Sequence, residues 1–317
     1  MPVGVTKRQA LALRIVMTAV VLAFVARALA RHWSEFSAMR FDLAFRPWWL
    51  ALTLAWIAVT TLLQVESWRH VLRGWGQHLR FSRAAEAWCL ANLGRYVPGK
   101  VWSVAGLVVL AQRDGVALWA SAASAVAIQA LGLGTCLAIV ALSLPGRLPT
   151  AATIGGAVGA AVLLAALGSE RLLAPLRRLA GERFALRPLP VRAIGASAAL
   201  TLASWMTYGM AFWSLARALG LGAGTAFTPV PAMGMFALGY LLGLLALLAP
   251  GGIGVREAVF ISLLTPVLGP GGAVALSVAS RLLLTITEAL SAGIAWLFAR
   301  DSRPRESDVD GGSHGAT

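Results

Sequence analysis

Long apolar stretches separated by short polar segments dominate the chain. Several of them reach about 20 residues, the length that crosses a bilayer as a helix. No alternating pattern typical of strands separates them. The pattern predicts six uninterrupted helices, over residues 10–30, 48–68, 117–144, 150–167, 193–219 and 273–299. We therefore expect an all-α, polytopic transmembrane helical bundle.

Two further apolar stretches, residues 81–112 and 230–268, are interrupted near their middle. Proline removes a backbone donor and glycine loosens the backbone, so neither stretch can continue as one helix, and each half is too short to span. Hydrocarbon tolerates broken backbone only where protein or a water-filled cavity covers it. We predict two re-entrant hairpins. Their breaks contain Pro98 and Gly99 in the first, and Pro250, Gly251, Gly252 and Gly254 in the second.

The distribution of Lys and Arg predicts the orientation in the membrane. Segments on one side of the predicted helices are much richer in these residues than those on the other, which favours a cytoplasmic N-terminus and C-terminus in the cell membrane. The two hairpins then enter from opposite sides. Residues 48–144 and 193–299 consequently predict an inverted repeat, the arrangement in which broken helices form transporter sites.

Composition narrows the class of protein further. The chain is 58% hydrophobic and 13% charged, whereas soluble domains carry about a quarter charged residues. We expect one transmembrane domain over residues 1–299 and a disordered cytoplasmic tail over 300–317. The net charge of +14 is explained by basic loops facing an anionic lipid surface, so no nucleic-acid partner is expected.

The sequence contains no catalytic or metal-binding constellation that we recognise. Its two cysteines, Cys89 and Cys136, lie in apolar segments, and the four histidines lie in loops or the tail, without metal-ligand spacing. We therefore expect neither a metal nor a cofactor, and no enzymatic activity.

Arg95, Tyr96 and Lys100 border the first break. The two cations can hold a lipid phosphate through charge-assisted hydrogen bonds, beside free backbone donors. Alternatively, they snorkel to the cytoplasmic surface. Lys occurs only at Lys7 and Lys100, which favours a specific role for the second. Tyr96 stacks on a headgroup in one interpretation and anchors the tip in the other.

Four further charges follow the second break. Arg256 and Glu257 form either a gate or substrate pair, or a structural ion pair with Arg281, Glu288 or the other hairpin. Arg281 and Glu288 lie two turns apart on one face of that helix, too far apart to pair with each other. Each needs a partner from elsewhere, so this face is expected to meet the hairpins. We assign all four to substrate binding.

Other polar residues are expected to support the scaffold. Glu66 and Glu86 are predicted partners for nearby arginines. A stripe on the helix at 193–219 presents one polar face, and four arginines predict a basic loop after residue 68. The stripe is Ser197, Thr201, Ser204 and Tyr208, and the arginines are Arg69, Arg73, Arg80 and Arg83.

Four ordered motifs resemble one known family. They are Asn92-Leu-Gly-Arg-Tyr-Val-Pro-Gly-Lys-Val-Trp102, Arg113-Asp-Gly-Val116, Pro250-Gly-Gly-Ile-Gly-Val-Arg-Glu257 and Ser280-Arg281. The chain resembles the transmembrane-region family of lysylphosphatidylglycerol synthases, which are also described as flippase-like membrane proteins. In bifunctional members such a domain is associated with moving aminoacylated phosphatidylglycerol between leaflets, and a separate soluble domain makes the lipid. The residues after 299 are too few for that domain, so synthase activity is not expected.

Three functions remain to be compared. The first is a transporter that flips an anionic phospholipid or lipid-linked substrate between leaflets. The second is an enzyme acting on a lipid headgroup, which the shortage of nucleophiles and bases disfavours. The third is a membrane-embedded partner or regulator of a lipid- or glycan-modifying enzyme, although such a scaffold would not need charged, broken helices. We expect transport, with the partner role as the alternative.

Overall fold

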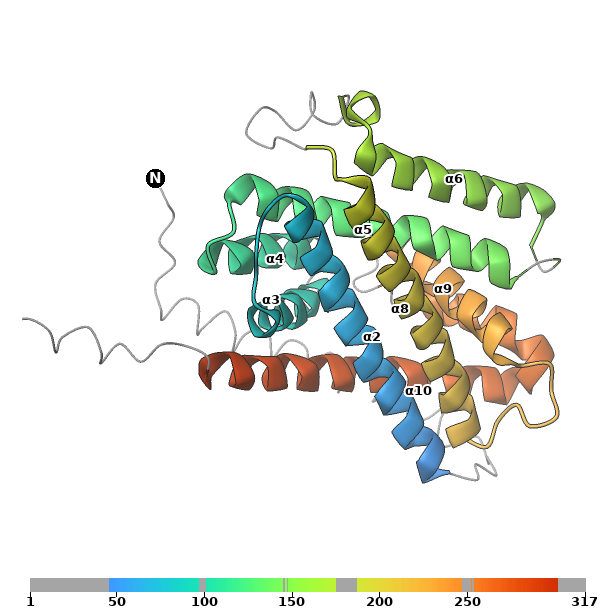
Figure 1. Ribbon diagram of the computed structural model, residues 1–317. Coiled ribbons are helices and arrows are strands. Elements are labelled where there is room, and N and C mark those ends of the chain that lie inside the picture. Colours follow the sequence, from blue (N-terminus) through green and yellow to red (C-terminus); the bar gives the residue numbers. More distant parts are fainter. Residues whose placement is uncertain are drawn as a thin grey trace, which may run out of the picture.

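The protein is a bundle of helices (Figure 1). The computed structural model describes residues 46–96, 101–144, 146, 148–174, 187–246, 252 and 254–301, and every regular element within them is helical. The predicted helix at 10–30 and most of the predicted tail lie outside these residues. The elements are α2 (Pro47–Gly74), α3 (Phe81–Leu93), the 3-10 turn η1 (Gly94–Tyr96), α4 (Val101–Arg113), α5 (Leu118–Ser143), α6 (Thr150–Gly168), α8 (Val191–Ala218), α9 (Pro229–Leu245) and α10 (Val255–Asp301).

Four of the described helices, α2, α5, α6 and α10, are long and apolar enough to cross a membrane. The expectation of an all-α membrane bundle is thereby confirmed. α8 has 28 residues but is not among the four, in keeping with the hydroxyl groups that it carries. α6 packs against α5 at the edge of the bundle.

Helices α2 and α8 form an antiparallel pair through the middle of the molecule. Their hydroxyl groups meet at intervals of about two turns. Oxygen–oxygen distances are 2.9 Å for Thr53–Ser214, 2.7 Å for Thr60–Thr207 and 2.8 Å for Ser67–Thr201. Small and hydroxyl-bearing residues let membrane helices approach closely and bond across the interface. We call this contact the hydroxyl seam: Thr53, Thr60, Ser67, Ser197, Thr201, Thr207 and Ser214.

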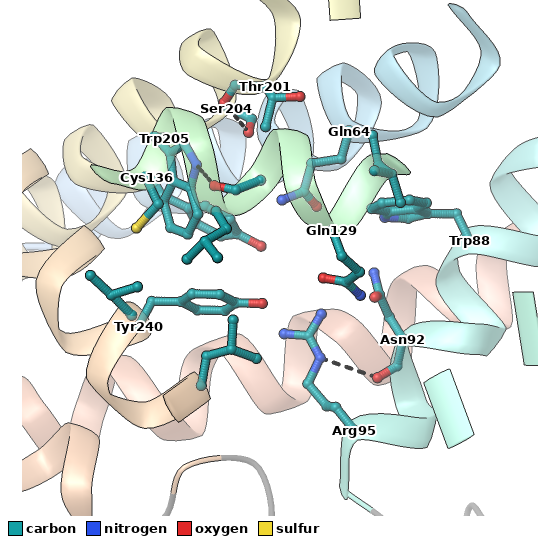
Figure 2. A pocket seen from close by; sticks show the side chains of 16 residues that line it. Gln64, Trp88, Asn92, Arg95, Gln129, Cys136, Thr201, Ser204, Trp205 and Tyr240 are labelled. Atoms are coloured by element: carbon teal, nitrogen blue, oxygen red, sulfur yellow. Dashed lines mark hydrogen bonds between the residues drawn. The ribbon is translucent and has the colours of Figure 1, made fainter. Parts of the chain in front are cut away.

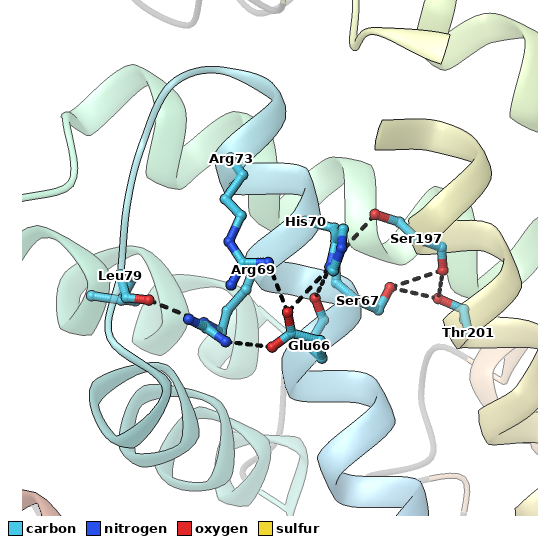
Figure 3. A network of polar contacts seen from close by, with 8 residues as sticks. All are labelled: Glu66, Ser67, Arg69, His70, Arg73, Leu79, Ser197 and Thr201. Carbon is cyan, nitrogen blue, oxygen red and sulfur yellow. Dashed lines mark hydrogen bonds and ion pairs between the residues drawn. The ribbon is translucent and has the colours of Figure 1, made fainter. Parts of the chain in front are cut away.

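The end of α2 corrects one prediction. The helix continues to Gly74, so Arg69 and Arg73 belong to its last turns and not to a loop. Glu66 pairs with both, as Figure 3 shows. Because residues three and seven positions further along a helix lie near one face, these ion pairs support the helix. Arg83 is also helical, in α3, and contacts Glu86 at 3.3 Å. The expectation that both glutamates pair with nearby arginines is confirmed.

Helices α3 and α4 pack against each other on one side of the central pair. A Cβ at Gly94 would lie 2.7 Å from the backbone nitrogen of Ser103, and one at Gly106 would lie 3.4 Å from the Cα of Ala91. Only glycine fits at residue 94, because the start of α4 touches the end of α3 there.

Helix α10 is folded back on itself. Gly269 has φ 72° and ψ 165°, between Pro266 and Pro270. Glu257 and Arg281 are 24 residues apart (281 − 257) and would lie about 36 Å apart in a straight helix, yet their charged groups approach to 3.6 Å. α10 is therefore two antiparallel limbs, which we call the first limb (residues 255–268) and the second limb (residues 270–301). This break agrees with the predicted boundary between a returning segment and a last helix.

The first limb also packs against α9. A Cβ at Gly239 would lie 2.2 Å from the ring of Phe260, and one at Gly243 would lie 3.4 Å from the Cβ of Arg256. The rings of Phe236 and Phe260 stack, with centroids 6.0 Å apart. Two glycines on α9 thus allow the first limb to lie close beside it.

The pair of α3 with α4 and the pair of α9 with the first limb each pack against a helix from the other half of the chain. On one side, Cys89 and Leu93 of α3 form an apolar cluster with Ala292 of the second limb. On the other, the thiol of Cys136 in α5 donates to the carbonyl of Ala237 in α9 at 3.3 Å. The two halves of the chain are therefore interlocked around α2 and α8.

Candidate functional site

Six residues from three distant parts of the chain meet inside the bundle. Arg95 and Tyr96 lie in η1, two follow the second break, and two lie on the second limb. We call this group the charged centre: Arg95, Tyr96, Arg256, Glu257, Arg281 and Glu288.

Glu288 holds the end of α3 to the second limb. Its Oε1 accepts from Nη1 of Arg95 at 3.0 Å, and its Oε2 accepts from the hydroxyl of Tyr96 at 2.8 Å. The hydroxyl of Thr285, one turn earlier, lies 3.2 Å from that of Tyr96. Both oxygens of the carboxylate are thus used by neighbouring residues of the first broken region.

Glu257 connects the second broken region to the same limb. Its Oε1 lies 3.6 Å from Nη1 of Arg281, and its Oε2 accepts from the backbone N–H of Gly254 at 2.6 Å. A glutamate at the third position of a helix commonly caps the first N–H in this way. The guanidinium of Arg281 lies 6.0 Å from the centre of the Tyr96 ring. Arg281 therefore contacts residues from both broken regions.

Arg256 differs from the other two arginines. It is 8% exposed, and its guanidinium lies over two aromatic rings, 4.8 Å from the centre of Phe236 and 5.1 Å from that of Phe260. Among the described residues its Nη2 has no hydrogen-bond partner and no carboxylate forms an ion pair with it. Aromatic faces attract cations but do not neutralise them.

The charged centre consequently carries an excess of positive charge. Its three arginines face two carboxylates, and both carboxylates already bind other groups. Buried cations in a membrane protein usually pair with a group of opposite charge or mark a substrate path. The three arginines of the charged centre therefore carry one positive charge more than its two carboxylates balance.

A cavity of about 80 Å³ lies beside the charged centre and is lined by Arg95 (Figure 2). Residues of two apolar clusters line it, Ile128 from one and Cys136 from the other, and both of these residues lie on α5. Its polar lining comes from α2, α3, α5, α8 and α9. The polar and aromatic residues are Gln64, Trp88, Asn92, Gln129, Thr201, Ser204, Trp205, Tyr208 and Tyr240.

A second, smaller cavity of about 20 Å³ is lined by Glu288. Gln64, Asn92 and Tyr208 line both cavities. The ion pair of Arg95 with Glu288 therefore lies between two polar spaces.

The structure answers only part of the sequence predictions for the site. It confirms that Arg281 and Glu288 find separate partners in the two broken regions. Gly252 and Gly254 have φ of 71° and 83°, conformations that favour glycine. The remaining assignments, Lys100, Pro98, Gly99, Pro250 and Gly251, lie outside the described residues. Substrate binding by any of these residues stays a prediction.

Sequence reasoning missed most of the cavity. Tyr208 was noted as part of a stripe, but Gln64, Asn92 and Gln129 were not singled out as site residues. The signal for Gln64 and Gln129 was a carboxamide in the middle of an apolar helix, which is costly in a membrane without a purpose. Single carboxamides on separate helices, however, do not reveal that they converge.

Comparison with known families identifies the chain. The family described as Lysylphosphatidylglycerol synthase TM region matches residues 9–292. The chain belongs to this family. No curated protein matches it. As a member of the Lysylphosphatidylglycerol synthase TM region family, it carries the quoted motifs at its charged centre: the first motif supplies Arg95 and Tyr96, the third supplies Arg256 and Glu257, and the fourth supplies Arg281.

Proposed function

We propose that this protein moves a lipid with an anionic headgroup between the leaflets of the cell membrane, and that the charged centre binds the phosphate. The observation that carries the proposal is Arg256, a cation that is 8% exposed and has no carboxylate ion pair among the described residues. Leaving a buried charge without a counter-charge is strongly unfavourable. A phosphate oxygen would supply that charge and the missing hydrogen-bond acceptor for Nη2.

The neighbouring ion pairs supply a way to admit and release the headgroup. Arg95 and Arg281 are held by Glu288 and Glu257 at 3.0 and 3.6 Å. An arriving phosphate competes with these carboxylates for the two guanidinium groups. Because the exchange replaces one ion pair by another, neither Arg95 nor Arg281 loses its counter-charge when the headgroup binds or leaves. Lys100 lies outside the described residues, and we keep it as a further proposed headgroup ligand because the first motif contains it.

We further propose that the two broken regions are re-entrant hairpins of an inverted repeat. Three contacts support the repeat. α2 pairs with α8, α3 packs on the second limb of α10, and α9 packs on α5. These are the contacts that a two-fold axis between α2–α5 and α8–α10 would generate. Both termini are cytoplasmic in this proposal, on the distribution of Lys and Arg.

The proposal is tested with purified protein in liposomes that carry a fluorescent anionic phospholipid. Arg256→Met keeps an apolar stem and removes the charge. It should lower headgroup binding roughly ten- to a hundredfold, the equivalent of the about 1.5–3 kcal/mol that one charge-assisted hydrogen bond contributes, and should slow leaflet exchange accordingly. Arg256→Lys should retain part of the activity because it keeps the charge without the planar fork.

Arg192→Met is the matched control, since Arg192 is exposed at the start of α8. Thermal stability must be compared as well: removing an unpaired buried cation should leave it unchanged or raise it. Wild-type exchange by Arg256→Met would contradict the assignment of the site. If the wild-type protein exchanges no lipid from a broad panel, transport itself is wrong and the role of an enzyme's partner is favoured.

A further inference from the structure

Five polar groups line the cavity beside Arg95. They are the carboxamides of Gln64, Asn92 and Gln129 and the hydroxyls of Tyr208 and Tyr240. In the part of the chain that the structure describes, none of these five groups hydrogen-bonds to another protein group. The indole N–H of Trp88, which also lines the cavity, is buried without a partner there. Figure 2 shows Gln129, Asn92 and Arg95 converging on the same space.

The chemistry of these groups selects the ligand. A carboxamide donates and accepts at once, as does a phenolic hydroxyl. The natural complement is a set of hydroxyl groups, which also donate and accept. Among the described residues, the cavity lining has one charged residue, Arg95, whose guanidinium is already bound by Glu288 at 3.0 Å. No carboxylate among those residues lines it to receive an ammonium group.

Aromatic rings complete one wall. Trp205 lies edge-on to Tyr240, with ring centroids 5.0 Å apart, and 6.1 Å from Tyr208. The indole N–H of Trp205 is bonded to the carbonyl of Gly132 at 3.2 Å, which fixes its orientation. Rigid rings of this kind present an apolar face with polar edges. They suit a ligand whose ring or chain has C–H groups on one face and hydroxyls at its rim.

The size of the cavity limits the ligand. A water molecule needs about 10–15 Å³ of such space, so 80 Å³ holds roughly five to eight groups of that size. This accommodates a small polyol or much of a sugar ring. Gln129 is exposed and Gln64 and Asn92 continue into the second cavity, so a larger headgroup can extend in either direction.

We propose that this cavity binds the uncharged polyhydroxyl part of a lipid headgroup, a sugar ring or a smaller polyol, while the phosphate lies toward Arg256. The position of the phosphate rests on the proposed function, whereas the recognition of hydroxyl groups by the cavity does not. The substrate class is therefore a lipid with a hydroxyl-rich, cation-free headgroup.

The test compares three lipids with matched acyl chains by native mass spectrometry of the purified protein. Phosphatidylinositol carries a phosphate and a polyol, phosphatidylmethanol carries the same charge without hydroxyls, and glucosyldiacylglycerol carries a sugar without charge. A polyoxyethylene detergent is used because sugar-based detergents would compete. We expect wild-type protein to bind phosphatidylinositol at least tenfold more tightly than phosphatidylmethanol, and to bind glucosyldiacylglycerol measurably.

Two variants probe the cavity from different helices. Gln64→Leu and Gln129→Leu should each weaken binding of the two hydroxyl-bearing lipids about tenfold, the effect of about one lost hydrogen bond. Neither should change binding of phosphatidylmethanol. Gln112→Leu is the matched control, because Gln112 is exposed on α4 and does not line the cavity.

The outcomes separate this proposal from the proposed function. The inference is wrong if wild type binds phosphatidylinositol and phosphatidylmethanol equally, or if neither cavity variant differs from Gln112→Leu. In either case the cavity does not recognise hydroxyl groups, while lipid exchange can still hold. If the hydroxyl preference is found but liposomes show no exchange of any lipid, the cavity assignment stands and transport fails.

Discussion

The bundle contains two polar systems in an apolar interior, the hydroxyl seam and the charged centre. The seam is neutral, and its hydroxyls bond both across the interface and to their own helices, as Thr60 does to Thr207 and to the carbonyl of Trp56. The charged centre joins three separate parts of the chain, and within the described ranges one donor atom of its Arg256, Nη2, has no acceptor. Both systems hold helices together, but only in the charged centre does a polar group lack a partner among the described residues.

This difference indicates what each system does. Hydroxyl pairs between membrane helices contribute little each, because an unfolded chain in the membrane also finds partners for them. Buried charges are costly when a partner is lost. The seam is suited to keeping α2 and α8 aligned while other parts move. The charged centre is suited to a site whose balance changes when a ligand arrives.

The largest loss of stability is expected for Glu288→Gln. It leaves Arg95 without its counter-charge, and an amide replaces the carboxylate that accepts from Tyr96. We expect the free energy of unfolding, measured by SDS titration in mixed micelles, to fall by about 3 kcal/mol, the lower end for a broken buried ion pair.

Arg95→Gln in the Glu288→Gln background should recover much of that loss, because no charge is then stranded. Glu170→Gln is the control, since Glu170 is exposed. A Glu288→Gln protein as stable as wild type would mean that losing a partner costs no more stability in the charged centre than in the hydroxyl seam.

A smaller loss is expected for Glu257→Gln. The amide oxygen can still accept from the backbone N–H of Gly254, and only the attraction to Arg281 at 3.6 Å is lost. The 3.6 Å separation is also longer than the 3.0 Å between Arg95 and Glu288, so the attraction that is lost is smaller. We expect about 1 kcal/mol by the same titration. A loss as large as that of Glu288→Gln would show that the two ion pairs are equivalent.

The smallest effect is expected for Thr60→Val in the seam. Valine keeps the shape of threonine and removes the hydrogen bond to Thr207. The expected loss is about 0.6 kcal/mol, the average for such bonds between membrane helices. Thr153→Val is the control, because the Thr153 hydroxyl contacts only the carbonyl of Pro149 at its own helix start among the described residues. Lipid exchange should be unchanged, and a strong loss of exchange would make the seam part of the transport path.

Local patterns in the sequence determined much of this fold. Apolar length placed α5, α6 and α8 to within about two residues, since burial in a bilayer demands such runs. Proline and glycine marked the interruption between α9 and the first limb. Heptad spacing of Arg281 and Glu288 was enough to show that each needs a different partner, because helix geometry fixes their separation.

The end of α2 was misjudged for an equally local reason. Arg69 and Arg73 were taken as loop residues, although Glu66 lies within reach of both on one helical face. Pairing offsets part of the cost of placing a charge on a membrane helix, so a helix can continue beyond its apolar run. Composition alone does not distinguish arginines in a loop from paired arginines at the end of a helix.

Tertiary structure alone decided the rest. Which carboxylate meets which arginine depends on Gly269 folding α10 back and on Gly94 admitting the start of α4 against the end of α3. The cavity joins Gln64, Asn92 and Gln129 from three helices that are far apart in sequence. Spacing rules describe one helix at a time, whereas a site in a bundle is made where faces of different helices meet, and that is set by the packing of the whole chain.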